Sequence, residues 1–159
     1  MGTNKTFFPG KSVFVTVISL LAILTSLVGV SLQSVSAAGT GPCDIYASAG
    51  TPCVAAHSTV RALFGAYSGR LYQVKRASNG NTTDIGTLSA GGVANAAAQD
   101  SFCSGTTCTI TIIYDQSGRG NDLTPAPAGG AKNTPDNPAN ATALPITING
   151  QKAYGVSIS

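Results

Sequence analysis

The segment 114–121 reads Tyr-Asp-Gln-Ser-Gly-Arg-Gly-Asn and places an acid and a base in a glycine-rich turn directly after an apolar run. At the end of a strand, Asp115 has the chemistry of a catalytic acid or a metal ligand. The alternative is structural, because an Asp carboxylate in a turn accepts backbone N–H groups and can also pair with Arg119. We expect the structural role, since these local contacts are the reason that Asp is favoured in turns.

Few other residues offer chemistry. His57 is the only histidine and could act as a general base, but it lies near an expected helix start, and we predict a structural or surface role. The chain contains no Glu and no Gly-x-Ser-x-Gly elbow, so a Ser-His-Asp triad has no support. The five tyrosines could stack on sugar rings, although we expect most of them to be half-buried core: Tyr46, Tyr67, Tyr72, Tyr114 and Tyr154. We therefore predict no catalytic residue, metal site or cofactor within this chain and assign no substrate-binding residue.

The four cysteines form two local pairs, Cys43 with Cys53 and Cys103 with Cys108. In an exported protein an even number of cysteines predicts disulfides, with three possible connectivities. The local connectivity closes the shortest loops and so costs the least entropy. A zinc site is the alternative, but these spacings without a nearby histidine pair fit zinc poorly.

The first 38 residues have the three-part layout of a secretory signal. Lys5 and Lys11 form a basic head, residues 13–30 carry no charge, and the small residues of 34–38 suit a signal peptidase. The apolar stretch is long enough that a membrane anchor is the alternative. We predict a cleaved signal peptide over 1–38, and hence a secreted, extracellular protein with no stable membrane association after cleavage.

In an exported protein, the two sequons that follow the leader are candidate glycosylation sites: Asn81-Thr82-Thr83 and Asn140-Ala141-Thr142. Both lie in segments that we expect to be loops, so Asn81 and Asn140 are candidate acceptors if the producing cell glycosylates.

Only 9% of the residues are charged, far below the roughly 25% of an average soluble protein. This composition excludes a long charged helix, a coiled coil and a basic nucleic-acid arm. Without the two lysines of the leader, seven basic and six acidic residues leave residues 39–159 nearly neutral. Near neutrality argues against nucleic acid as a partner and suits a neutral polysaccharide.

Periodicity predicts two short helices over 58–69 and 93–102. The expected strands are 71–76, 82–88, 109–114, 145–148 and 151–158, the last two joined at an Asn149-Gly150 hairpin turn. We expect 109–114 to be central because it is β-branched almost throughout, and 41–52 and 116–143 to be loops. These elements give a thin core, and the chain stops inside an alternating strand. We therefore expect residues 39–159 to be the N-terminal part of a larger β-rich domain.

Several stretches together resemble one known family. They are Gly-Pro-Cys-Asp-Ile-Tyr at 41–46, Thr-Pro-Cys-Val-Ala-Ala-His-Ser-Thr at 51–59, Leu-Tyr-Gln-Val-Lys-Arg at 71–76, and the segments 88–100, 111–121 and 149–156. The chain resembles the catalytic domain of glycoside hydrolase family 54, the α-L-arabinofuranosidase B family, over nearly all of 41–158.

The resemblance implies an all-β-dominated fold, a concanavalin A-like β-sandwich (jelly roll) that is incomplete here and carries two short helices. It implies removal of non-reducing-end arabinofuranosyl residues from arabinan and arabinoxylan by a retaining mechanism, with no cofactor. It also implies disulfides Cys43–Cys53 and Cys103–Cys108.

The family's glutamate nucleophile, its aspartate acid/base and its vicinal cysteine pair belong to the later part of the domain, beyond residue 159. No catalytic residue is therefore carried over, and we expect this chain alone to be inactive, because retaining hydrolysis needs two carboxyls about 5–5.5 Å apart. Asp122, where relatives more often have His, and the 125–145 loop depart from the family pattern. A non-catalytic concanavalin A-like carbohydrate-binding module is the alternative function.

Overall fold

The computed structural model describes residues 1–2, 39–130 and 132–157. The predicted signal peptide lies outside the described residues, apart from its first two positions. Every described helix and strand lies within residues 37–159, the second of the two units into which the chain divides. Among the described residues, no helix has the length and apolar character needed to cross a membrane.

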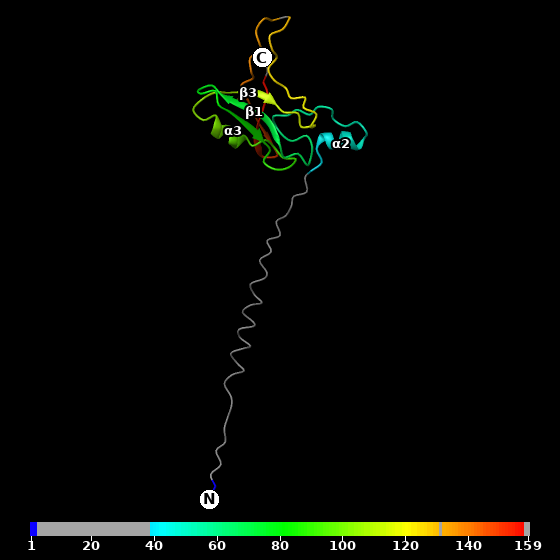
Figure 1. Ribbon diagram of the computed structural model, residues 1–159, viewed down its shortest axis with the longest axis vertical. Helices are drawn as coiled ribbons and strands as arrows, with labels where there is room; N and C mark the ends of the chain where they lie inside the picture. The colour runs from blue at the N-terminus through cyan, green and yellow to red at the C-terminus, as the bar shows by residue number, and fades with distance from the viewer. Residues whose placement is uncertain (3–38, 131, 158–159) are drawn as a thin grey trace. The chain divides into compact units, whose positions relative to one another are not determined.

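The regular elements of the second unit are mainly antiparallel strands, with two short helices, as predicted (Figure 1). Its elements in chain order are α2 (Pro42–Ser48), β1 (Arg70–Arg76), β2 (Thr82–Gly86), α3 (Ala96–Phe102), β3 (Cys108–Ile113), β4 (Leu144–Ile148) and β5 (Gln151–Gly155). The strands form a three-stranded sheet in the order β2-β1-β3 and a two-stranded sheet β4-β5. The two helices lie well apart, on either side of the strands (Figure 1).

The central strand of the larger sheet is β1, so the prediction that 109–114 would be central was wrong. The outer edge of β3 is covered by loop backbone instead of a strand. Ile113 exchanges two hydrogen bonds of 2.9 Å with Leu123, and the Ile110 N–H donates to the Ala139 carbonyl at 2.8 Å. The β-branched residues of β3 therefore reflect packing on the faces of the sheet and not the position of the strand within it.

The helix expected over 58–69 is absent, because the backbone of this segment bonds to distant parts of the chain. Ser58 does cap a turn, since its hydroxyl accepts from the Val60 and Arg61 N–H groups. Beyond it, the Ala62 N–H donates to Gly92 and the Leu63 carbonyl accepts from Cys43, each at 2.9 Å. These long-range partners replace the bonds that a helix would make four residues along the chain.

Residues 42–48, expected as a loop, form α2 instead. Pro42 stands at the start of the helix, where its missing N–H costs nothing. Asp44 completes a cap because its Oδ2 accepts from the Gly41 N–H at 2.7 Å and from the Gly65 N–H at 2.6 Å. The second bond ties α2 to a segment 21 residues further along the chain.

The other local predictions are confirmed with shifted ends. α3 begins at Ala96, later than expected, because Asn95 is its N-cap and accepts from the Ala98 N–H at 3.1 Å. The β4–β5 hairpin turns at Asn149 and Gly150 with φ of 50° and 76°, the left-handed values that a two-residue turn of this kind requires. Within the described residues, 116–143 holds no helix or strand, as expected.

Both predicted disulfides are present, Cys43–Cys53 and Cys103–Cys108. The second joins the end of α3 to the start of β3 beside the core, which consists of Leu71, Tyr72, Val74, Ile85, Ala94, Cys103, Cys108, Ile110 and Ala141. A buried polar chain crosses this core: the Tyr72 hydroxyl donates to Gln99 at 2.6 Å, and Gln99 donates to the Ala141 carbonyl at 2.8 Å. The covalent and polar links together hold α3 on one face of the three-stranded sheet.

Candidate functional site

Asp115 stands just beyond the end of β3 and is the most heavily hydrogen-bonded carboxylate in the described part of the chain. Its side chain accepts from the N–H groups of Ala56 at 2.9 Å, Ser117 at 2.8 Å and Asn121 at 3.1 Å. The Ser117 hydroxyl donates to it at 2.7 Å. With the residue only 8% exposed, Asp115 anchors the 115–121 turn to a segment that lies 59 residues earlier.

The electrostatics of this turn support the structural interpretation. Burial alone would raise the pKa of Asp115, but the hydrogen bonds from Ser117, Ala56 and Asn121 outweigh burial and hold the pKa well below its usual value. The carboxylate is therefore ionised and occupied by donors. Arg119 is exposed and, among the described ion pairs, does not reach Asp115, so that part of the expectation was wrong.

His57 has a structural role, as expected. Its Nε2 lies 2.6 Å from the Asn121 carbonyl oxygen, and Asn121 in turn donates from its side chain to the Val54 carbonyl at 3.0 Å. His57 thus joins the 54–57 segment to the same turn that Asp115 anchors.

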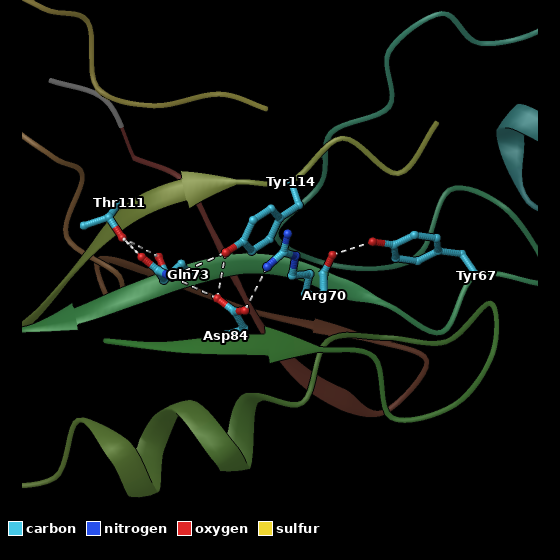
Figure 2. A network of polar contacts seen from close by, with 6 residues as sticks. All are labelled: Tyr67, Arg70, Gln73, Asp84, Thr111 and Tyr114. Carbon is cyan, nitrogen blue, oxygen red and sulfur yellow. Dashed lines mark hydrogen bonds and ion pairs between the residues drawn. The ribbon is translucent and has the colours of Figure 1, made fainter. Parts of the chain in front are cut away.

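A second polar cluster covers the face of the three-stranded sheet opposite α3 (Figure 2). Asp84 of β2 is its centre: its Oδ1 accepts from the Tyr114 hydroxyl at 2.8 Å and from Gln73 Nε2 at 3.1 Å. Arg70 lies 3.4 Å from the other carboxylate oxygen. We call Arg70, Gln73, Asp84, Thr111 and Tyr114 the sheet-face cluster.

A β-bulge completes the sheet-face cluster. Gln73 pairs with Ile112 and Val74 with Ile110, so Thr111 is an extra residue in β3. Its hydroxyl donates to Gln73 Oε1 at 3.0 Å. The bulge therefore orients Gln73 so that its amide nitrogen faces Asp84.

Burial and hydrogen bonding set the protonation of this cluster. The Arg70 guanidinium lies 3.9 Å from the centre of the Tyr114 ring. Burial, followed by the hydrogen bond and charge of Asp84, raises the pKa of Tyr114 to about 12. Burial acts to raise the pKa of Asp84 as well, but the donors Tyr114, Gln73 and Arg70 outweigh it and lower that pKa. At neutral pH the cluster is thus a protonated phenol beside an ionised carboxylate.

All six aspartates have identified partners. Asp44 caps α2, Asp84 centres the sheet-face cluster, Asp100 binds Lys152 and Tyr154, Asp115 anchors its turn, Asp122 accepts from the Asp115 N–H, and Asp136 pairs with Lys132. No group of three or more potential metal ligands occurs among the described residues. The lowered pKa of Asp84 keeps its carboxyl ionised, so Asp84 is not suited to act as a general acid near neutral pH.

The tyrosines lie mainly in the core, as expected. Tyr72, Tyr114 and Tyr154 are buried and Tyr67 is half-buried, whereas Tyr46 on α2 is 57% exposed. Sequence reasoning missed Arg70, Gln73 and Asp84 as a group. The alternation in 71–76 places Gln73 on the wet face, but only the strand register brings Asp84 opposite it.

The chain is similar to fungal arabinofuranosidases. The family model "Alpha-L-arabinofuranosidase B, catalytic" matches residues 42–159. A probable α-L-arabinofuranosidase B of Aspergillus terreus is 68% identical over 142 residues, which are 87% of this chain and 28% of that protein. An α-L-arabinofuranosidase of Hypocrea jecorina is 68% identical over 78% of this chain and 25% of that protein. The chain thus spans about a quarter of the length of these relatives.

Solved structures agree with the sequence matches. A crystal structure of arabinofuranosidase complexed with arabinofuranosyl-α-1,2-xylobiose is 60% identical, with a TM-score of 0.71 over 74% of this chain and 25% of that chain. A family 54 arabinofuranosidase soaked with a cyclic sulfate inhibitor gives a TM-score of 0.70 at the same identity and coverage. These neighbours support the β-sandwich class predicted from the sequence. The chain belongs to the α-L-arabinofuranosidase B catalytic family, glycoside hydrolase family 54.

Proposed function

We propose that this chain is the N-terminal part of the catalytic domain of a secreted α-L-arabinofuranosidase. The observation that carries the proposal is the 68% identity to the Aspergillus terreus relative over 87% of this chain. Such similarity extends over most of the chain and is not confined to a short motif.

The substrate class follows from the relatives. A structural neighbour holds arabinofuranosyl-α-1,2-xylobiose, which is a xylan backbone unit carrying an arabinofuranosyl branch. The nearly neutral residues 39–159 suit an uncharged polysaccharide. We propose that the protein removes non-reducing-end arabinofuranosyl residues from arabinoxylan and arabinan with retention of configuration.

The acids of a retaining reaction come from outside this chain. Retention requires one carboxylate as nucleophile and a second carboxyl that is protonated at the right moment, about 5–5.5 Å away. This chain contains no Glu, and each of its aspartates is engaged by donors or a cation. Its role in catalysis is to build part of the sandwich that supports the acid pair.

A chimera tests the proposal. Residues 39–159 replace the matching quarter of the Aspergillus terreus protein, and hydrolysis of 4-nitrophenyl α-L-arabinofuranoside is measured. We expect the chimera to hydrolyse this substrate at a rate similar to that of the relative, and the chain alone to give no release above the blank. Release of nitrophenol by the purified chain would contradict the proposal that the catalytic acids come from outside it. A folded but inactive chimera would contradict the proposed role of this chain within an arabinofuranosidase.

The finer parts of the proposal have separate readouts. The configuration of the first sugar product, measured by NMR, reports retention, and arabinose released from arabinan and from arabinoxylan reports the substrate. N-terminal sequencing of protein from the culture medium reports export, with the mature chain expected to begin after Ala38. If the chain binds polysaccharide in affinity electrophoresis while the chimera stays inactive, the alternative of a binding module replaces the enzyme.

A further inference from the structure

We propose that Asn81 is the N-glycosylation site of residues 39–159 and that Asn140, the other sequon of this region, stays unmodified. The inference rests on the proposed export, because N-glycans are added in the secretory pathway. Both sequons satisfy the sequence rule of Asn, any residue except proline, then Ser or Thr, so the sequence alone does not distinguish them. The structure does, through the surroundings of the two side-chain amides.

Asn81 is the last residue of the β1–β2 turn, directly before β2. Residues 77–82 are all exposed, and Gly80 has a φ of 74° that turns the chain. The backbone is held, since the Arg76 N–H donates to the Asn81 carbonyl at 2.9 Å and the Asn81 N–H donates to Asn79 at 3.1 Å. Within the described part of the chain the Asn81 carboxamide makes no hydrogen bond, so its nitrogen is free to carry a glycan into solvent.

The surroundings of Asn140 are different. Its Oδ1 accepts from both the N–H and the hydroxyl of Thr142, at 2.9 and 3.0 Å. The middle residue, Ala141, is completely buried and donates to the Cys108 carbonyl at 2.9 Å. The Asn140 sequon is therefore held against β3, and both its acceptor amide and its threonine hydroxyl are already engaged.

Asn140 also lines a groove along β3. This groove has a volume of about 580 Å³, and its walls include Ile110, Ile112, Leu123 and Pro138. A glycan on Asn140 would start among the side chains that line this groove, whereas a glycan on Asn81 would start in open solvent.

The modification is a group transfer from a lipid pyrophosphate-linked oligosaccharide. The Asn81 Nδ2 attacks the anomeric carbon of the donor sugar, and a nitrogen–carbon bond forms as the bond from that carbon to the pyrophosphate oxygen breaks. The amide loses one proton to a base of the transferase, and the lipid pyrophosphate leaves. No oxidant or reductant is involved. Thr83 at the third position supplies the hydroxyl that the transferase recognises.

Two neighbouring threonines provide matched variants. Thr83→Ala destroys the first sequon, whereas Thr82→Ala on the same strand leaves it intact. The full chain is translated with eukaryotic microsomes; resistance to added protease reports translocation, and a gel shift removed by endoglycosidase reports the glycan. We expect the wild-type chain, Thr82→Ala and Asn140→Gln to show a single endoglycosidase-sensitive shift, and Thr83→Ala and Asn81→Gln to lose it.

The outcomes separate the inference from the proposed export. A protease-resistant chain without a shift, a shift that persists in Thr83→Ala, or a shift lost in Asn140→Gln overturns the assignment of Asn81 while export stands. A chain that protease degrades fully contradicts export, and the assignment falls with it.

Discussion

The 115–121 turn and the sheet-face cluster are each built around one aspartate, but the donors differ. Asp115 is almost buried and takes three of its bonds from backbone N–H groups. Asp84 is exposed and takes its bonds from the side chains of Tyr114, Gln73 and Arg70. Backbone donors cannot rotate away, so Asp115 fixes the path of the chain. Side-chain donors keep their freedom and compete with water, so Asp84 organises a surface.

Neither aspartate is a free catalytic acid, and the reason is common to both. A general acid near neutral pH needs a raised pKa, whereas the donors around both carboxyls lower theirs. The two regions should nevertheless respond differently when their aspartates are altered: the turn by losing stability and the cluster by losing local order.

The largest effect is expected for Asp115→Ala. The substitution leaves the buried N–H group of Ala56 and the part-buried N–H group of Ser117 without an acceptor, and a buried donor left without its partner costs about 1–3 kcal/mol. We expect the free energy of unfolding, measured by urea titration, to fall by about 3 kcal/mol. Asp115→Asn keeps one acceptor oxygen and should lose less. If Asp115→Ala lowers the free energy of unfolding by less than about 1 kcal/mol, Asp115 does not anchor the turn.

Acid should weaken the turn more than it weakens the cluster. The pKa of Asp115 is lowered in the folded chain, so the unfolded chain binds the proton more readily than the folded one. The stability from Asp115 is present above the unfolded pKa of about 3.9 and is lost as pH falls through the folded pKa. Urea titrations at decreasing pH should show this fall, and Asp115→Asn should flatten it more than Asp84→Asn does.

Tyr114→Phe should give an intermediate effect. It removes the hydroxyl that donates to Asp84 at 2.8 Å but keeps the ring beneath Arg70. We expect a loss of about 1 kcal/mol in the free energy of unfolding, since one hydrogen bond to a charged acceptor disappears. Tyr46→Phe, at an exposed position, is the control and should change nothing.

The same variant tests the raised pKa of Tyr114. Because the pKa in the folded chain is about 12, the contribution of Tyr114 is complete below the unfolded value of about 10 and is lost as pH rises through 12. A titration followed by tyrosinate absorbance should show one fewer tyrosine that ionises well above pH 10 in Tyr114→Phe than in the wild-type chain. If the titration at high pH is the same in Tyr114→Phe and in the wild-type chain, the raised pKa belongs to another tyrosine.

The smallest effect is expected for Arg70→Ala. The Arg70 and Asp84 side chains are 57% and 36% exposed and 3.4 Å apart, so their ion pair contributes about 0.2–1 kcal/mol and weakens with salt. Arg70→Lys keeps the charge but loses the planar contact with Tyr114. A loss in Arg70→Ala larger than that of Tyr114→Phe would show that the cation, and not the hydrogen bonds, holds the cluster together.

Prediction from sequence succeeded where neighbouring residues decide the structure. Alternating residues in β1 and the Asn149-Gly150 turn are local signals, and both were interpreted correctly. The helix expected over 58–69 failed because its apolar spacing fitted a helix while its backbone partners were Gly92 and Cys43, far away in the chain. The helix at 42–48 was missed because its Gly-Pro start was interpreted as a turn, although proline is also common at the first position of a helix. Part of its cap is a hydrogen bond from the distant Gly65 N–H to Asp44.

The site shows the same division. The turn chemistry of Asp115 and the local disulfides were predictable because the partners are close in the chain: Ser117 lies two residues from Asp115, and the members of each cysteine pair are ten and five residues apart. The contact of Asp115 with Ala56 and the meeting of Gln73, Asp84 and Tyr114 were not predictable. They depend on strand register and on the bulge in β3, which no local pattern specifies.

By itself, the sequence determined the family, the mainly antiparallel fold class, the cysteine pairing and the hairpin, because these follow from residue identity and short spacings. Only the tertiary structure decided that Asp115 is an anchor, that Asp84 centres a polar sheet face, and which sequon amide stands free. Each of these depends on hydrogen bonds between residues far apart in the chain, whose geometry exists only after the strands have paired.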